Sequence, residues 1–482
     1  MGTTVFERRR PPASVIERSL AETEQRVFWL DDLGDGAKRT RPRLTSERVA
    51  DLAIVGGGYT GLWTAVLAKR RNPDAHVVLV EAKAIGWAAS GRNGGFCEAS
   101  LTHGRENGMS RWPEEMPTLD RLGIENFDAI EAAESELGMD FEFERNGSLG
   151  IAVEPHQVEW LHEQVAEAQA RGDDTLRFLD ESAVRAEVDS PTYLAGVWDT
   201  RGSAILHPAK LAAELARVAE ELGVEIYERF PVRRLDTPGS TGAVALVTDG
   251  GRVLAERAVL ATNVFPSLLK RNRLMTVPVY DYALMTEPLS AEQLASIGWS
   301  NRQGLGDLAN QFHYYRLSRD NRILFGGYDA VYHYGRRVRE QYEERPESYE
   351  RLAAHFFTTF PQLEGLRFSH RWAGAIDTST RFCAFFGTAR DGRVAYAAGF
   401  TGLGVASTRF AAEVMLDQLE QRDNERTRLR MVRERPLPFP PEPAAAIGIN
   451  ATRWSLDRAD HTGGKRNMLL KTLDALGLGF DS

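Results

Sequence analysis

The chain has 482 residues, a formal net charge of −9 at pH 7 and two cysteines, Cys97 and Cys383. This length exceeds one ordinary hydrophobic core, so two intertwined or consecutive domains are expected. The acidic balance gives no general attraction to nucleic acid or anionic membranes, and the sequence offers no membrane-spanning run of about 18 apolar residues. Two cysteines form neither a disulfide framework nor a zinc-binding pattern, so we expect a cytoplasmic protein without a metal site.

Residues 1–48 are expected to form an extension that lies over the body of the protein. They mix charged residues with Pro11, Pro12 and Pro42. The apolar group at residues 27–30 (VFWL) can anchor them.

Residues 51–81 predict a β-α-β unit that binds the adenosine end of a dinucleotide. Gly56, Gly58 and Gly61 follow a short apolar strand in the spacing G-x-G-x-x-G and open a helix. These glycines allow a tight turn, close approach of the backbone to a pyrophosphate, and close helix–strand packing. The second strand ends at Glu81, whose carboxylate can accept hydrogen bonds from ribose hydroxyls and would repel a 2′-phosphate. FAD or NAD is therefore expected rather than NADP.

The loop at residues 86–96 (GWAASGRNGGF) has small residues that would let backbone amides approach another part of a cofactor. The alternative is a flexible surface loop. Residues 111–200 are charged and helix-rich, with a predicted strand at 148–153 and no chemical motif.

The middle of the chain predicts a return to the nucleotide domain. A helix opens at Pro208 and stops at Gly223. Strands are predicted at 224–227, 231–235, 243–247 and 252–254, followed by an apolar strand at 258–263.

Residues 275–330 predict long strands of a second sheet. Alternation puts Phe312, Tyr314 and Arg316 on one face and residues 313, 315 and 317 on the other, so one face could line a pocket. From residue 393 a buried strand, a glycine turn and a helix follow, and the helix N-terminus would make a second positive backbone site. A proline-rich linker and short amphipathic helices end the chain.

Taken together, these motifs resemble the D-amino-acid oxidase and sarcosine oxidase superfamily of FAD enzymes, most closely its γ-glutamylputrescine oxidase branch. The resemblance covers roughly residues 45–420 and rests on GGGYTGL with Glu81, ASGRNGG at 89–95, VLATN at 259–263, HYYRL followed by RILFGG, and GFTGLG at 399–404. It implies an α/β fold with a Rossmann-like FAD-binding domain of discontinuous segments and a substrate domain whose mixed β-sheet roofs the isoalloxazine.

The expected division gives the FAD-binding domain residues 49–100, 201–272 and 371–420. The helical and substrate domain takes residues 101–200 and 273–370. Residues 1–48 form the N-terminal extension, and residues 421–482 form a Pro-linked helical C-terminal extension.

The resemblance also implies a set of cofactor-binding residues. Val232 would present its backbone to adenine, and the turn at 402–405 would face the flavin pyrimidine. The full set is Gly56, Gly58, Tyr59, Thr60, Gly61, Glu81, Ala82, Ser90, Arg92, Asn93, Gly94, Gly95, Val232, Thr262, Gly374, Gly402, Leu403, Gly404 and Val405. FAD is expected without a covalent link, since Arg92 and Gly374 stand where covalent family members use histidine or cysteine.

The expected reaction is the oxidation of an amine. Hydride from the carbon that bears the amine passes to flavin N5, water hydrolyses the imine, and O₂ becomes H₂O₂. A helix N-terminus aimed at the flavin pyrimidine would stabilise the negative charge of the reduced ring. Phe325 replaces the lysine that sarcosine oxidases place over the flavin, and other oxidases of the superfamily lack this lysine.

Departures from the family pattern predict the substrate. The tryptophan–glycine segment lacks the arginine that grips an α-carboxylate, and Arg381 replaces a family acid. We therefore predict a primary or secondary amine with a remote polar or anionic tail held by Arg316 and Arg381. Tyr314 or Trp372 would flank the amine. The alternative is that both arginines are surface ion-pair members.

His313 completes the catalytic candidates, although a hydrogen-bonded structural role suits it better than that of a base. Three other functions stay open: an amine dehydrogenase with another electron acceptor, an FAD monooxygenase that uses NADPH, and a non-catalytic flavin-bound assembly protein. A small amine and O₂ are the expected partners.

Overall fold

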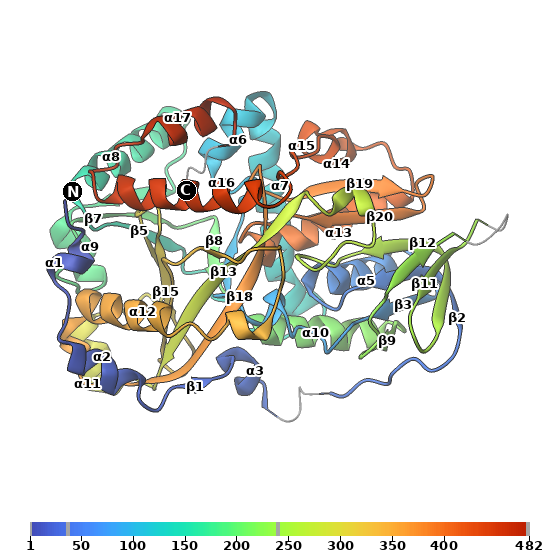
Figure 1. Cartoon of the computed structure of the whole chain (residues 1–482), viewed down its shortest axis with the longest axis horizontal. Coiled ribbons are helices and arrows are strands. Elements are labelled where there is room, and N and C mark those ends of the chain that lie inside the picture. Colours follow the sequence, from blue (N-terminus) through green and yellow to red (C-terminus); the bar gives the residue numbers. More distant parts are fainter. Residues whose placement is uncertain (1, 35–38, 238–241, 479–482) are drawn as a thin grey trace.

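Two large β-sheets, one of eight strands and one of ten, lie side by side in the computed structural model, which describes residues 2–34, 39–237 and 242–478 (Figure 1). Helices pack around both sheets, which confirms the α/β class. The ends of both predicted extensions, residue 1 and residues 479–482, lie outside the described residues. None of the helices in these ranges combines the length and apolar character needed to cross a membrane.

The eight-stranded sheet is built around the predicted β-α-β unit. β2 (Arg48–Val55) and β3 (Val77–Val80) pair in parallel and α5 (Tyr59–Arg71) connects them. The strand order is β10-β11-β12-β2-β3-β9, and β20 pairs with the second half of β12. The added strands are β9 (Glu225–Tyr227), β10 (Arg234–Asp236), β11 (Val244–Val247), β12 (Arg252–Leu260), β19 (Phe385–Ala389) and β20 (Val394–Ala398).

β12 is one continuous strand where the sequence predicted two. Glu256 and Arg257 interrupt the apolar pattern, but parallel pairing with β2 continues through Arg257 opposite Leu52. The backbone ladder thus overrides the local polarity.

The ten-stranded sheet has the order β1-β18-β13-β16-β15-β14-β5-β7-β6, with β17 beside β13. Its centre is the long antiparallel pair β13 (Thr276–Thr286) and β18 (Phe368–Ser379). The other strands are β1 (Glu24–Gln25), β5 (Ser148–Ala152), β6 (Leu176–Leu179), β7 (Ala195–Asp199), β14 (Gly304–Asp307), β15 (His313–Leu317), β16 (Ile323–Gly327) and β17 (Val331–Tyr332). The domain boundary expected at residue 371 falls inside β18, because that strand stays paired with β13. The domain division itself stays a prediction.

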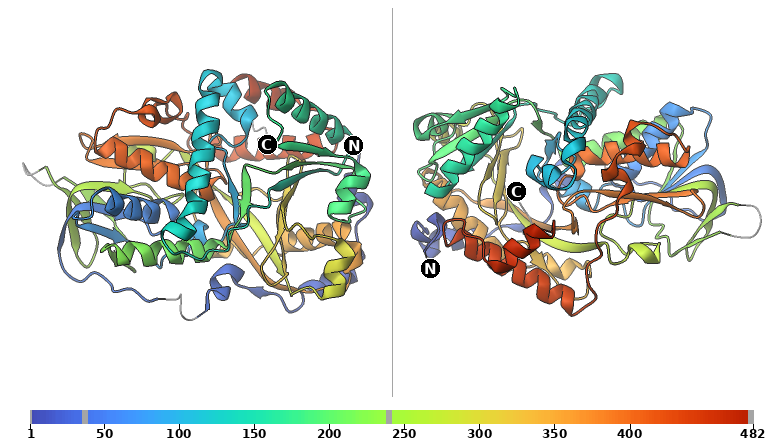
Figure 2. Two further views of the ribbon diagram at one scale, coloured as in Figure 1. Left: turned by 180° about the vertical axis from the view of Figure 1, so that it is seen from behind. Right: turned by 90° about the horizontal axis from the view of Figure 1, so that it is seen from above.

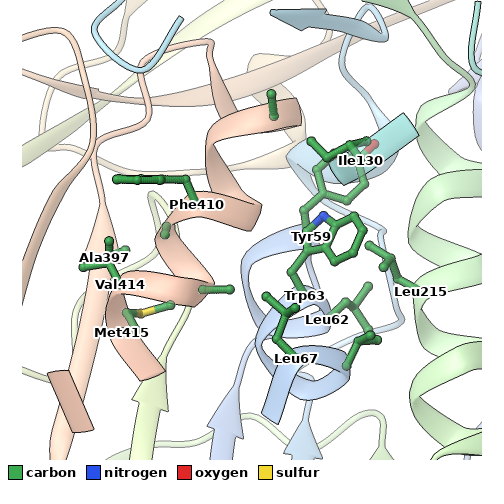
Figure 3. Packing of buried hydrophobic residues seen from close by; sticks show 14 of the residues in the cluster. Tyr59, Leu62, Trp63, Leu67, Ile130, Leu215, Ala397, Phe410, Val414 and Met415 are labelled. Carbon is green, nitrogen blue, oxygen red and sulfur yellow. The ribbon is translucent and has the colours of Figure 1, made fainter. Parts of the chain in front are cut away.

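Packing among three helices fixes the position of the glycine turn of the β-α-β unit. α5 lies between α10 (Pro208–Glu221) and α13 (Gly404–Leu419). Figure 3 shows Tyr59, Leu62 and Trp63 of α5 between Leu215 of α10 and Phe410 of α13. Burial of each such large apolar side chain contributes about 1.5–3 kcal/mol. The position of the α5 N-terminus is therefore well determined.

The remaining helices of the body cover the ten-stranded sheet and the join between the sheets. They are α6 (Arg105–Arg111), α7 (Met116–Glu136), α8 (Pro155–Ala170), α9 (Glu181–Glu187), α11 (Ala291–Ile297) and α12 (Pro346–Thr359). A small sheet joins β4 (Phe96–Glu98) to β8 (Ser203–Ile205).

The N-terminal extension lies along the body as predicted. It contains α1 (Val5–Arg8), α2 (Ala13–Leu20), β1 and α3 (Phe28–Asp32), and β1 adds a parallel strand beside β18. Val27, Phe28 and Trp29 are buried in one cluster with Met285 and Trp372.

The C-terminal extension folds back over the molecule. Its helices are α14 (Glu425–Arg428), α15 (Arg430–Arg433), α16 (Ala444–Asp460) and α17 (Met468–Ala475). α16 crosses the part formed by the ten-stranded sheet (Figure 1), and Figure 2 shows α16 and α17 side by side there.

Candidate active site

A cavity of about 1900 Å³ extends between the two sheets. Pockets for small ligands usually measure about 300–1,000 Å³. This one is therefore large enough for a dinucleotide together with a second molecule.

The turn between β2 and α5 accepts only glycine at two positions. A Cβ on Gly56, whose φ is +115°, would lie 2.3 Å from the carbonyl oxygen of Ala261, and a Cβ on Gly61 would lie 1.9 Å from that of Gly56. Gly58 caps α5 and lines the cavity, so the positive helix N-terminus faces the space where a pyrophosphate would bind.

Glu81 lies at the end of β3 with its carboxylate in the cavity wall. Its Oε2 accepts the N–H of Gly57 at 2.7 Å, and its Oε1 accepts the N–H of Lys83 and the indole N–H of Trp87, both at 2.8 Å. A carboxylate has about four acceptor positions. About one therefore stays available for a ribose hydroxyl.

The loop at residues 86–96 is packed between the sheets, so the flexible-loop alternative is wrong. Ser90 Oγ accepts the N–H of Tyr59 at 3.0 Å, which ties the loop to the start of α5. Asn93 Oδ1 accepts the N–H of Gly95 at 2.8 Å. A Cβ on Gly94 would lie 2.8 Å from the ring of Tyr314, so this glycine allows the loop to contact the ten-stranded sheet.

Arg92 and Trp372 are joined by a hydrogen bond in the cavity wall. The Trp372 indole donates to the carbonyl oxygen of Arg92 at 2.8 Å. The Arg92 guanidinium donates to the Trp87 carbonyl oxygen at 2.8 Å and pairs with Glu343 at 2.6 Å. Arg92 is thus held by protein groups.

Asp377 forms a hydrogen bond to the second glycine turn, which comprises residues 399–404. Its carboxylate accepts the N–H of Gly399, and burial raises its pKa to about 7. Gly399 and Gly402 have φ values of +78° and +94°, a conformation that favours glycine. The turn delivers the N-terminus of α13, at Gly404, to the cavity, where the predicted second positive backbone site lies.

The structure brings nearly all the predicted cofactor-binding residues to this one cavity. Those that line it are Gly56, Gly58, Tyr59, Thr60, Glu81, Ala82, Ser90, Arg92, Asn93, Gly94, Val232, Thr262, Gly374, Gly402, Leu403, Gly404 and Val405. Gly61 and Gly95 do not line the cavity. A Cβ on Gly95 would lie 2.2 Å from the carbonyl oxygen of Leu206, so both glycines serve backbone packing.

At the ten-stranded sheet the cavity wall contains a partly buried acid, Asp281, that sequence analysis missed. The Tyr314 hydroxyl donates to Asp281 Oδ2, and both residues line the cavity together with Trp372. Burial raises the pKa of Asp281 to about 6. The available signal was an acid inside the apolar strand VPVYDYALM.

His313 lies on the opposite face of the sheet, outside the cavity lining. Its Nδ1 lies 2.6 Å from Asp307 Oδ2 and its Nε2 lies 2.9 Å from His355 Nδ1. Phe325 packs beside it with ring centroids 5.0 Å apart. This geometry agrees with the structural interpretation of His313, and it places Phe325 in the core rather than over the cavity.

Arg316 and Arg381, the predicted tail anchors, do not line the cavity. Arg316 is buried over the ring of Trp29, at 5.1 Å, and donates to the Leu206 carbonyl. Arg381 donates to the Glu434 carbonyl at 3.0 Å. Arg316 contacts the N-terminal extension and Arg381 the C-terminal extension. Both side chains are buried, so the alternative of surface ion pairs does not describe them either.

The fold and cavity are those of a dinucleotide-binding protein whose cavity extends from the glycine turn to a second sheet. Residues 51–418 match the DAO family, described as FAD dependent oxidoreductase. The match covers well over half of the chain, and the chain therefore belongs to this family of FAD-dependent enzymes.

Named relatives agree with the family. Gamma-glutamylputrescine oxidoreductase of Escherichia coli is 31% identical over 78% of this chain and 85% of its own length. A probable oxidoreductase OrdL of Haemophilus influenzae is 27% identical over 78% and 84%. In fold, glycine oxidase from Geobacillus kaustophilus matches with a TM-score of 0.65 at 20% identity, over 78% of this chain and 96% of its own.

The residues present fit FAD. Glu81 and the glycine turn suit the adenosine and pyrophosphate parts, while the α13 N-terminus and the loop at 89–95 lie in the same cavity nearer the second sheet. FAD supplies an acceptor for a hydride when bound.

Proposed function

We propose that this enzyme oxidises a primary or secondary amine that carries a polar or anionic tail. The amine loses a hydride from its carbon to FAD, the imine is hydrolysed by water, and O₂ is reduced to H₂O₂. The cytoplasm is the proposed compartment, in keeping with the two buried free thiols.

The observation that carries the proposal is the group of Asp281, Tyr314 and Trp372 in the cavity wall. A carboxylate beside two aromatic rings attracts an ammonium group by charge and by cation–π interaction. Asp281 would thus bind and orient the amine end of the substrate, which must lose its extra proton before its carbon can give up a hydride. The name of the relative gamma-glutamylputrescine oxidoreductase also describes an amine with a remote polar part.

Anaerobic mixing of the FAD-loaded enzyme with an amine panel tests this function. The panel contains γ-glutamylated amines, N-methyl amino acids, polyamines and aminophosphonates. We expect tailed amines to bleach the flavin absorbance. Bleaching by none of them would favour the non-catalytic assembly protein instead.

The electron acceptor needs its own assay. Admission of air after reduction should produce one H₂O₂ per amine oxidised. Much faster reoxidation by an artificial dye than by air would identify a dehydrogenase, and NADPH consumption coupled to hydroxylation would identify a monooxygenase.

A further inference from the structure

The C-terminal extension forms one wall of the cavity. It crosses the part of the molecule formed by the ten-stranded sheet (Figures 1 and 2) and lies beyond the family match, which ends at residue 418. Its lining residues come from the proline-rich segment at 437–440 and from α16 and α17. Whatever binds at this end of the cavity therefore meets a surface that the family match does not include.

Several hydrogen bonds fix α16 over this end. Asp460, in its last turn, accepts the backbone N–H groups of Asn310 at 2.9 Å and Gln311 at 3.3 Å. At the other end, Glu442 accepts the hydroxyl of Tyr332 and the N–H of Gly335, the latter at 3.1 Å. α16 is thus tied at one end to the loop before β15, which carries Tyr314, and at the other to β17 and the loop after it, where β17 pairs with the Asp281 strand β13.

The cavity face of α16 is small and apolar apart from one charged side chain. Ala445, Ile449, Thr452 and Leu456 repeat at helical spacing and line the cavity, and Arg453 lines it next to them. A cation has a poor environment on such a face unless an anion joins it.

Arg453 has no protein partner for its charge. It is half-buried, and within residues 2–34, 39–237 and 242–478 its side chain forms no hydrogen bond and no ion pair. Asp329, an acid that also lines the cavity, pairs with Arg345 and Arg351 instead.

The other positively charged residues that line the cavity differ from Arg453 in their ion pairs or in their position. Arg92 pairs with Glu343. The rest are exposed and lie in or beside β10, between β12 and β13, or between β19 and β20: Arg233, Arg234, Lys270, Arg271, Arg273 and Arg390. Among the described lining residues, Arg453 is therefore the half-buried arginine whose charge has no protein partner.

We propose that Arg453 binds the anionic tail of the substrate and so selects amines that end in a carboxylate or phosphonate. This inference rests on the proposed function and names the group that recognises the tail. A guanidinium can form two parallel hydrogen bonds with either anion. With the amine at Asp281 and the tail at Arg453, the substrate spans the cavity between the second sheet and α16.

Arg453→Met tests the proposal, since methionine keeps most of the apolar length but removes the charge. We expect KM for a tailed amine to rise about 10- to 100-fold while kcat changes little, because the contact forms in the bound substrate and in the transition state alike. An amine of similar length without an anion should show unchanged kcat/KM. Arg458→Met is the matched control, because Arg458 is exposed on the same helix and stacks on Trp454.

Binding of butyrate, a monocarboxylate without an amine, gives a readout independent of turnover. Calorimetry should detect binding to the wild-type protein and to Arg458→Met, and at least tenfold weaker binding to Arg453→Met, with partial recovery in Arg453→Lys. If tailed amines reduce the flavin of Arg453→Met and the wild type with equal kcat/KM, the inference fails and the proposed function stands. If no amine reduces the wild-type flavin, both fail.

Discussion

Asp460 of α16 accepts two hydrogen bonds from Asn310, one from its backbone N–H at 2.9 Å and one from its side-chain amide at 2.7 Å. Asn310 lies between β14 and β15 and lines the cavity. This pair therefore joins the C-terminal extension directly to the proposed substrate site.

Asp460→Ala should loosen α16. Loss of an acceptor for these partly buried donors costs up to about 1–3 kcal/mol, so the extension should be cleaved faster in limited proteolysis and KM for a tailed amine should rise. Asp457→Ala on the same helix is the control, because the Asp457 carboxylate lies 4.0 Å from its nearest basic partner, His461. Equal cleavage rates for Asp460→Ala and the control would contradict the role of this pair.

Glu81→Gln should weaken FAD binding about 10- to 100-fold, because the amide loses the negative charge and turns a donor toward a backbone N–H or a ribose hydroxyl. Titration of apoprotein with FAD, followed by flavin fluorescence, measures this. The control is Glu228→Gln, since Glu228 is also buried and follows the neighbouring strand β9 but does not line the cavity. The stronger change Glu81→Lys should abolish FAD binding, and retained FAD in that variant would show that Glu81 has no part in the site.

The flavin should be released without a covalent link. Cys383 is buried outside the cavity lining, and Arg92 and Gly374 stand at the positions where the family resemblance implies a histidine or cysteine for covalent attachment. Acid precipitation is expected to leave a colourless pellet and a yellow supernatant. A yellow pellet would contradict this expectation.

Asp281→Asn should remove an acidic limb from the pH profile. Burial raises the pKa of Asp281 from 3.8 to about 6, so the carboxyl group is neutral below that pH and charged above it. A cationic amine needs the charged form, so wild-type kcat/KM should fall as the pH drops through about 6. Asp281→Asn should lower kcat/KM about 10- to 100-fold at pH 8 and flatten this limb.

Stability gives a second readout for Asp281. Because its folded-state pKa lies above the unfolded value, its contribution to folding is greatest below pH 3.8 and is lost as the pH rises through about 6. Asp281→Asn should therefore reduce the fall in Tm across this pH interval. An unchanged acidic limb and an unchanged Tm profile would together exclude Asp281 as the titrating group.

The sequence by itself determined the parts that depend on local chain geometry. The glycine spacing at Gly56, Gly58 and Gly61 and the acid at Glu81 belong to one short β-α-β motif, and the structure places them where the motif predicts. Alternation along β15 also predicted that Tyr314 and His313 would face opposite sides of a sheet, because strand side chains alternate whatever the partner strands are.

Only the tertiary structure decided which side chains reach the substrate end. Arg316 shares the cavity side of β15 with Tyr314, yet Trp29 and Leu206 enclose it, and Arg381 turns toward the backbone of Glu434. Sequence patterns cannot show which arginines are enclosed by protein and which reach the cavity. Arg316 is enclosed by segments more than a hundred residues away, whereas Arg453 reaches the cavity because of the way α16 packs. The wall formed by the C-terminal extension is decided in the same way, by long-range packing and by the hydrogen bonds of Asp460.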